Sequence, residues 1–255
     1  MKRILEKIAI VKWSYRFFRR LASYPRYLLD FYRFRRLAAY SERHFPVRWR
    51  DLYPCLDDRT TTTGFDRHYV YHPAWAAGIV AELNPSCHVD ISSTLHFCTI
   101  VSAFIPVRFL DYRPAELNLD NLDPMAGDLR ELPFLDGSVE SLSCMHVLEH
   151  IGLGRYGDRL DPDGDRKAIV ELKRVLAPGG ALLVVVPVGV PKIMFNAHRV
   201  YSYDQVMEYF SDLTLDEFAL VPDSPEQGGL IRHATKEAAD AQVYGCGCFF
   251  FRRKE

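Results

Sequence analysis

The sequence contains few cysteines, and it lacks the glycine motifs that hold phosphates. Six cysteines are spread over 255 residues. They are too few, and too deeply embedded in expected strands, to form a disulfide framework, which indicates a reducing compartment. No G-x-G-x-x-G motif stands at the start of a helix after the first expected strand, and G-x-x-x-x-G-K-[ST] is absent. The sequence therefore argues against nicotinamide binding and against a phosphate-loop nucleotidase.

The sequence also lacks a hydrophobic run long enough to span a membrane. The uncharged stretch Ile91 to Val107 has 17 residues and is rich in Ser, Thr and His. A spanning helix needs about 20 predominantly apolar residues. Near the start, Glu6, Lys7 and Lys12 interrupt any apolar core of a signal peptide. We therefore expect a cytoplasmic protein, either free or peripheral on the inner face of the membrane.

Charge is distributed unevenly along the chain. Residues 1–50 contain 14 Lys/Arg and 3 Asp/Glu, a net charge of +11, and the remainder contains 18 and 30, a net charge of −12, which together give the formal −1. Such a basic segment suggests an anionic partner: membrane lipid, nucleic acid or a phosphorylated substrate.

Residues 1–43 form a basic, aromatic arm. Five apolar residues alternate at spacings of four and three, which predicts one face of a helix: Ile4, Ile8, Val11, Tyr15 and Phe18. Pro25 is expected to interrupt this helix. Rings and cations together suit an anionic membrane surface, which residues 1–40 would contact. The alternative is that the apolar face packs on the folded domain. Nucleic acid is less favoured, because the aromatic residues follow helical spacing and form no stacking platform.

The segment from Asp136 to Pro187 has the pattern of a parallel α/β sheet. A buried strand is expected over Ser138 to Met145, an amphipathic helix over Arg166 to Leu176, and an apolar strand over Ala181 to Val186. A helix that ends in glycine and is followed at once by an apolar run is typical of a strand buried on both faces. Ligands of such sheets lie beyond the carboxyl ends of the strands.

The rest of the chain extends this pattern. Residues 44–85 form a lead-in segment and a first helix, and 86–255 form the α/β domain. Further elements are expected in order: strands His88–Ile91 and Val107–Leu110, a short helix 118–122, and a terminal antiparallel pair, Thr214–Val221 and Ala241–Phe251. The prediction is a Rossmann-like, mostly parallel sheet with a carboxyl-terminal hairpin, preceded by the basic helical arm.

This order of elements resembles the class I (Rossmann-like) S-adenosylmethionine-dependent methyltransferases over roughly residues 86–252. The chain is most similar to a bacterial methyltransferase-like group with three motifs. They stand here as Val89-Asp90-Ile91-Ser92-Ser93, as L-E-H-I-G-L-G-R-Y-G-D at Leu148 to Asp158, and as F-N-A-H-R at Phe195 to Arg199. The resemblance implies a methyltransferase with S-adenosylmethionine as its cofactor. It also implies a small polar or glycan-type acceptor, phosphorylated or lipid-linked, and methylation at oxygen.

The resemblance implies cofactor contacts at strand ends. Asp90 matches the acid beside the turn that holds the methionine part, and Asp111 matches the carboxylate that accepts hydrogen bonds from both ribose hydroxyls. Asp128 matches the acid that binds the adenine amino group, and Leu129 would flank the ring. The alternative for each Asp is a helix N-cap or a turn residue.

The turn after the first strand departs from the methyltransferase pattern. Where glycines are usual, this chain has Ser92, Thr94 and His96. A non-glycine residue in the left-handed region costs about 1–2 kcal/mol, so we expect the loop to adopt another shape. Either the hydroxyls of Ser92, Ser93 and Thr94 hydrogen-bond the cofactor carboxylate, or the cofactor has been lost. In the second case the chain is an inactive methyltransferase-like scaffold or a membrane-associated partner protein.

Three histidines are candidate general bases for methyl transfer to a hydroxyl: His150, His146 and His198. His150 is preferred because it begins the loop expected to cover the acceptor, and His146 is expected to line the cofactor cleft. The alternative is a hydrogen-bonded structural histidine. Acceptor binding is assigned to the two motif segments that follow, through Arg155, Tyr156, Asn196 and Arg199.

No metal is expected from the sequence. Cys246 and Cys248 lie on one face of a strand, but no partner pair has zinc-ligand spacing, so they are interpreted as packing residues. The oligomeric state is left open.

Overall fold

The computed structural model describes residues 2–43 and 45–255, which form two compact units, Met1–Gly64 and Phe65–Glu255. Within the first unit, helix α1 spans Lys2–Ala38 and continues through Pro25. The expected interruption at Pro25 is therefore wrong. The short helix η1, Trp49–Asp51, returns to α1, where the Trp49 ring lies 4.7 Å from Phe31 and 5.2 Å from Tyr32 between ring centroids. No described helix is both long and apolar enough to cross a membrane.

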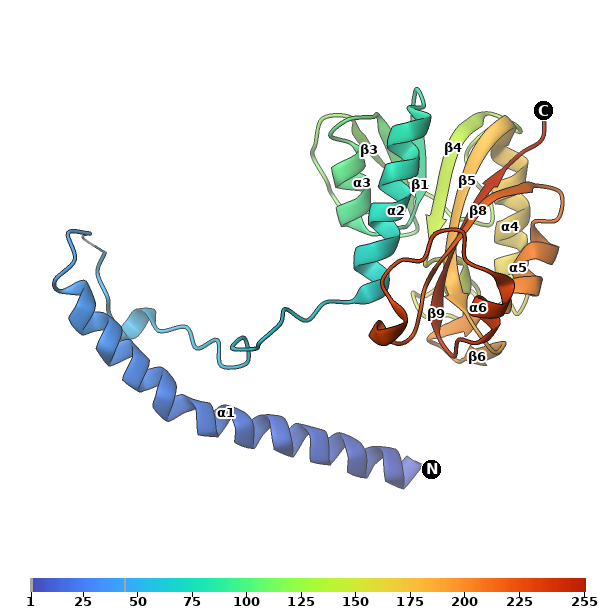
Figure 1. The fold of residues 1–255 in the computed structure, drawn as a ribbon. Coiled ribbons are helices and arrows are strands. Elements are labelled where there is room, and N and C mark those ends of the chain that lie inside the picture. Colours follow the sequence, from blue (N-terminus) through green and yellow to red (C-terminus); the bar gives the residue numbers. More distant parts are fainter. Residues whose placement is uncertain (1, 44) are drawn as a thin grey trace. The chain divides into compact units, whose positions relative to one another are not determined.

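The second unit is built on a seven-stranded sheet in the order β3-β2-β1-β4-β5-β9-β8 (Figure 1). The first five strands are mutually parallel, whereas β9 pairs antiparallel with both β5 and β8. The strands are β1 His88–Ile91, β2 Val107–Asp111, β3 Leu122–Ala126, β4 Val139–Met145, β5 Leu176–Val188, β8 Thr214–Val221 and β9 Gly245–Arg252. The predicted Rossmann-like sheet with a terminal antiparallel pair is confirmed.

Helices cover both faces of this sheet (Figure 1). Helices α2 and α3 pack on one face, and α4, α5 and α6 pack on the other. Strand β4 is almost continuously buried, and β5 is apolar and buried from Ala181 onward, because both faces of these strands are covered. The helices are α2 Arg67–Leu83, α3 Leu95–Val101, α4 Gly164–Val175, α5 Tyr203–Tyr209 and α6 Lys236–Asp240, with the short η2 Leu148–His150 and η3 Pro225–Gln227.

Three elements differ from the sequence-based expectation. The short helix expected at 118–122 is absent, and Leu122 instead begins β3. Helix α2 starts at Arg67, capped by Asp66, whose side chain accepts a hydrogen bond from the Tyr69 N–H at 3.3 Å. It belongs to the α/β unit, so the division between the units lies at Gly64 and not at residue 85. A small hairpin, β6 Lys192–Met194 and β7 His198–Val200, carries the F-N-A-H-R motif.

Candidate functional site

A cleft lies at the carboxyl ends of β1, β2, β3 and β4. It consists of two adjoining cavities of about 220 and 50 Å³. In a doubly wound sheet the strand order reverses beside the first strand, here between β1 and β4, and ligands bind there. Both cavities are lined by Ser92, Tyr112, Val147, His150, Ile151 and Tyr156.

The turn after β1 takes the conformation that the sequence argued against. Ser92 has φ +53°, in the left-handed region, so the expectation of a different loop shape is wrong. Its hydroxyl donates to the Leu110 carbonyl at 3.1 Å and its N–H donates to the same oxygen at 2.8 Å. These bonds to β2 offset the cost of a side chain at positive φ. The serine thus reproduces the backbone shape usually given by glycine.

Of the three hydroxyl residues in this turn, only Ser92 lines the cleft. The Ser93 hydroxyl accepts from the Met145 N–H at 3.2 Å, and Thr94 caps α3 by accepting from the Phe97 N–H at 3.2 Å. Both side chains therefore hold the local structure. This placement argues against the predicted contact of Ser93 and Thr94 with the cofactor.

Asp90 is fully buried beneath the turn and does not reach the cleft. Its carboxylate accepts from the Ser93 N–H at 3.0 Å and from the Ser143 hydroxyl at 2.6 Å. His88 continues this buried chain through Ser143, with Nε2 at 2.9 Å from the hydroxyl. Asp90 therefore shapes the turn as a positioning residue, which corrects the predicted cofactor contact.

Burial raises the pKa of Asp90 from 3.8 to about 6, against the opposing effect of its hydrogen bonds. Between these values the folded state holds a proton that the unfolded state has released, so the Asp90 contribution to stability falls as pH rises. We expect Asp90→Asn, which cannot ionise, to gain on the order of 2 kcal/mol relative to the wild type between pH 4 and pH 7. Urea unfolding of both proteins at several pH values measures this difference. The other ionisable groups near Asp90 are Asp111 and His88, whose pKa burial lowers to about 3. Both are present in the wild type and in the variant, so the comparison isolates the ionisation of Asp90. A pH-independent difference would contradict the assignment.

Asp111 and Asp128 both reach the cleft, with different environments. Asp111 ends β2 and lines the larger cavity; its Oδ1 accepts from the Arg113 N–H at 2.7 Å, and Oδ2 has no hydrogen bond among the described residues. Asp128 lines the smaller cavity, but Arg130 binds its carboxylate with Nη2 to Oδ2 at 2.7 Å and Nε to Oδ1 at 3.0 Å. This ion pair lowers the pKa of Asp128. Asp111 is therefore the more available acceptor.

Solved structures of methyltransferases share this architecture. The chain is similar to the N-methyltransferase NodS from Bradyrhizobium japonicum in complex with S-adenosyl-L-homocysteine: 14% identity, 74% of this chain and 89% of that chain covered, TM-score 0.54. It is also similar to the methyltransferase in complex with the Haloferax volcanii Trm112 activator: 19% identity, 74% and 91% covered, TM-score 0.51. A third is the Burkholderia thailandensis 1,6-didemethyltoxoflavin-N1-methyltransferase: 13% identity, 72% and 79% covered, TM-score 0.51. The chain has the class I methyltransferase fold.

Sequence comparisons add little to this structural likeness. A family model described as "Caenorhabditis protein of unknown function, DUF268" matches residues 135–211, from just before β4 to just after α5. No curated protein matches the chain.

On this methyltransferase fold, a buried group of histidines and one carboxylate follows β4. His146 Nδ1 lies 2.7 Å from Glu149 Oε1, and His150 Nε2 lies 3.9 Å from the same oxygen. Burial raises the pKa of Glu149 to about 7 and lowers that of His146 to about 4. Burial also lowers the pKa of His150. The imidazoles are therefore neutral near pH 7, the form that accepts a proton.

The orientation of His150 suits a base. Its Nδ1 lies 2.7 Å from the Ala197 carbonyl, which accepts only from an N–H, so Nε2 carries the lone pair. Arg155 donates from Nη1 to the same carbonyl at 3.1 Å. His198 begins β7 with its ring 6.4 Å from that of His150, and its Nε2 is buried without a partner among the described residues.

The predicted acceptor-binding residues do not form one cluster. Tyr156 lines both cavities, with the guanidinium groups of Arg113 and Arg155 at 4.8 and 5.1 Å from its ring centroid. Asn196 is exposed in the β6–β7 turn and lines neither cavity. Arg199 is buried and donates to the Ile151 carbonyl at 2.7 Å and to that of Pro162 at 3.2 Å. Because its guanidinium is occupied, Arg199 holds the loop together, which corrects its predicted role as an anion clamp.

Sequence reasoning missed several lining residues. Tyr112 directly follows Asp111, so the rule that ligands lie beyond strand ends could have identified it. Val147 and Ile151 flank the histidines of the same segment. His68 and His72 on α2 line neither cavity but lie beside His146. The sequence gave no signal for them, because their spacing does not show which strand ends the helix approaches.

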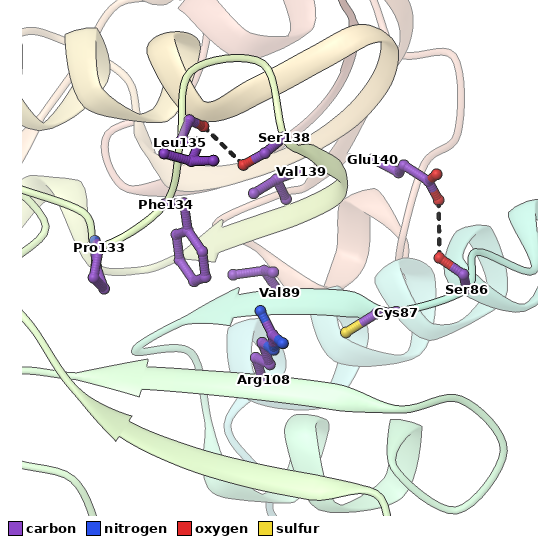
Figure 2. A pocket seen from close by; sticks show the side chains of 10 residues that line it. All are labelled: Ser86, Cys87, Val89, Arg108, Pro133, Phe134, Leu135, Ser138, Val139 and Glu140. Carbon is purple, nitrogen blue, oxygen red and sulfur yellow. Dashed lines mark hydrogen bonds between the residues drawn. The ribbon is translucent and has the colours of Figure 1, made fainter.

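A larger hollow of about 440 Å³ lies at the opposite, amino end of β1 and β4 (Figure 2). Its lining includes Arg108, Cys87 and Phe134, and its rim is fixed by two hydrogen bonds, from Ser86 to Glu140 and from Ser138 to the Leu135 carbonyl. Size does not make it the candidate site, because ligands of open parallel sheets bind at the carboxyl edge.

Proposed function

We propose that this protein is an S-adenosylmethionine-dependent methyltransferase acting on a small polar acceptor. The observation that carries the proposal is the cleft at the carboxyl edge of a class I methyltransferase sheet, with the available carboxylate of Asp111 at the end of β2. Asp111 Oδ2 is suited to accept hydrogen bonds from vicinal hydroxyls of a ribose.

The lining of the cleft fits an adenosyl group in two respects. Ser92 keeps the turn in the left-handed shape and lines both cavities. The smaller cavity is bordered by the apolar side chains of Leu129 and Val147, which suit the faces of a purine ring. The Asp128 carboxylate is already paired with Arg130. We therefore propose that Leu129 and Val147 contribute more to binding of the adenine ring than Asp128 does.

When bound, S-adenosylmethionine supplies a methyl group on a sulfonium centre, and the chain positions the acceptor and removes its proton. We propose His150 as that base, because it borders the cleft with Nε2 unprotonated. Glu149, 3.9 Å from Nε2, would stabilise the imidazolium that forms.

The acceptor is proposed to be a small polar or glycan-type molecule methylated at oxygen. Tyr156 lines the cleft beside His150, and the Arg155 guanidinium lies over its ring; together they offer a ring face and a cation to a hydroxylated, phosphorylated or lipid-linked group. His146 is proposed to line the cofactor side, and His198 and Asn196 the acceptor side.

Isothermal titration of the full-length protein with S-adenosylmethionine and S-adenosylhomocysteine tests the proposal. We expect saturable 1:1 binding with a dissociation constant of 1 mM or below. Absence of heat and of any thermal shift would favour the alternative, an inactive methyltransferase-like scaffold. With binding established, transfer of a labelled methyl group to sugars, sugar phosphates and amines distinguishes oxygen from nitrogen acceptors.

We propose separately that the arm docks the protein on an anionic membrane surface. On the described part of α1, large apolar residues are exposed beside arginines; they include Phe18, Leu21, Leu29, Phe34 and Leu37. Each Lys or Arg near an anionic bilayer contributes about 1 kcal/mol. We therefore expect full-length protein with Arg33, Arg35 and Arg36 changed to Gln to bind phosphatidylserine vesicles about 100-fold more weakly than wild type. Co-sedimentation measures this, with neutral vesicles and a DNA oligonucleotide as comparisons. Equal binding to neutral vesicles, or tighter binding to the oligonucleotide, would overturn the proposal.

A further inference from the structure

Three side chains from distant parts of the chain meet beside the cleft. They are His68 on α2, His146 after β4 and Cys246 on β9, and their ligand atoms all lie within 4.8 Å of one another. His146 Nε2 is 3.5 Å from Cys246 Sγ. A tetrahedral ion with bonds of about 2.0–2.1 Å to nitrogen and about 2.3 Å to sulfur separates two such ligands by about 3.5 Å. The spacing already matches two ligands of one ion.

His146 is held in the orientation that metal ligation requires. Its Nδ1 lies 2.7 Å from Glu149 Oε1, and when that nitrogen donates to the carboxylate, Nε2 is left with its lone pair toward Cys246. A ligating histidine commonly donates its other ring N–H to a carboxylate, which fixes the tautomer and the ring orientation. Ring stacking of His68 on His146, at 5.3 Å between centroids, holds the second imidazole alongside.

The surroundings contain buried polar atoms that the chain leaves unsatisfied. Glu149 Oε2 and His72 Nε2 are buried and have no hydrogen-bond partner among the described residues. His72 Nδ1 lies 2.7 Å from the His68 carbonyl, so its ring is fixed within 5.1 Å of that of His146. Buried polar groups without partners are rare and usually mark an ion, a water molecule or a functional role.

Charge also points to a cation here. Among the described residues no Lys or Arg pairs with Glu149, although this carboxylate is almost completely buried; its ionic contacts are with His146 and His150. A buried carboxylate without a counter-charge is costly. A divalent cation bound by the thiolate of Cys246 and balanced by Glu149 would make the group neutral overall.

We propose that His68, His146 and Cys246 bind one divalent ion of the zinc class, with Glu149 orienting His146. Imidazole and thiolate ligands together select zinc over magnesium or calcium, which prefer oxygen. Three protein ligands leave one position for water or for an acceptor atom, the pattern of open zinc sites. The site adjoins the cleft through His146, which lines the larger cavity. Metal binding does not depend on the methyltransferase proposal.

Titration of full-length, chelator-treated protein with Zn²⁺ tests this inference. We expect one equivalent to bind, and Co²⁺ in its place to give a thiolate-to-metal charge-transfer band. Cys246→Ser and His68→Ala should each weaken Zn²⁺ binding by more than about 100-fold, and Glu149→Gln by about 10–100-fold. Cys87→Ser, at the opposite edge of the sheet, is the matched control and should bind as wild type.

Folding of each variant is checked by circular dichroism, and His68→Ala, at a half-buried helix position, provides a ligand deletion outside the deep core. The inference is overturned if Cys246→Ser and His68→Ala bind Zn²⁺ as tightly as the wild type. It is also overturned if Co²⁺ gives no charge-transfer band, or if the wild-type protein does not bind one equivalent of Zn²⁺. In those cases the Cys246 thiol simply donates a hydrogen bond to His146.

Discussion

Replacement of Asp111 by alanine should lower the affinity for S-adenosylhomocysteine by about 100-fold. Two hydrogen bonds from ribose hydroxyls to a carboxylate would be lost, and each bond to a charged group contributes about 1.5–3 kcal/mol. In the variant, water molecules hydrogen-bond the ribose hydroxyls and regain part of this free energy. We therefore expect a net loss of about 3 kcal/mol in binding free energy. Isothermal titration measures the dissociation constant.

Two further variants make this test specific. Asp111→Asn keeps an oxygen for the Arg113 N–H, which Asp111 now binds at 2.7 Å, but loses the negative charge, so we expect a loss of about 10-fold. Asp120→Ala removes an exposed carboxylate before β3 and should leave binding unchanged. An unaltered dissociation constant for Asp111→Ala in folded protein would remove Asp111 from the cofactor site.

Gly152→Ala should lower the free energy of unfolding by about 3–5 kcal/mol. Gly152 has φ +81°, and an added Cβ would lie 2.0 Å from the backbone oxygen of Asp161. The left-handed conformation alone costs about 1–2 kcal/mol, and relief of the clash must move the backbone. Ile151 lines the cleft, so we also expect weaker S-adenosylhomocysteine binding. Urea unfolding and titration measure the two effects.

Gly157→Ala is the matched control for Gly152→Ala within the same loop. Gly157 has φ +86°, but an added Cβ would meet nothing within 4 Å. Only the conformational cost of about 1–2 kcal/mol is expected. Equal losses of stability in the two variants would show that the contact with Asp161 contributes nothing.

The order of strands and helices could be predicted well, because it depends on local pattern. The apolar run of β5 after α4, and the alternation of strands with amphipathic helices, indicate a covered parallel sheet whatever the remaining sequence does. Strands β1 and β8 begin and end at the predicted residues. The helix expected at 118–122 was wrong because Leu122–Ala126 completes the edge of the sheet beside β2, a long-range pairing that local propensity does not contain.

The sequence could predict where the candidate cleft lies, but not the chemical role of each residue in it. Strand ends located Asp111, Asp128 and the segment from His146 to Tyr156, and these residues do line it or adjoin it. Their chemical roles depend on partners from other elements. The sequence did not show that Arg130 would form an ion pair with Asp128, or that the Arg199 guanidinium would donate its hydrogen bonds to backbone carbonyls. The roles in binding and catalysis remain predictions.

The sequence by itself determined the class of fold, the edge of the sheet where the candidate cleft lies and the separation of a basic arm from an acidic domain. Only the tertiary structure decided that Ser92 takes a left-handed conformation, since bonds to Leu110 on the neighbouring strand stabilise it. Only the tertiary structure brought His68 and Cys246 to His146. The physical reason is the same in both cases. Local pattern fixes which residues form each element, whereas distances between side chains arise from packing of elements far apart in the chain.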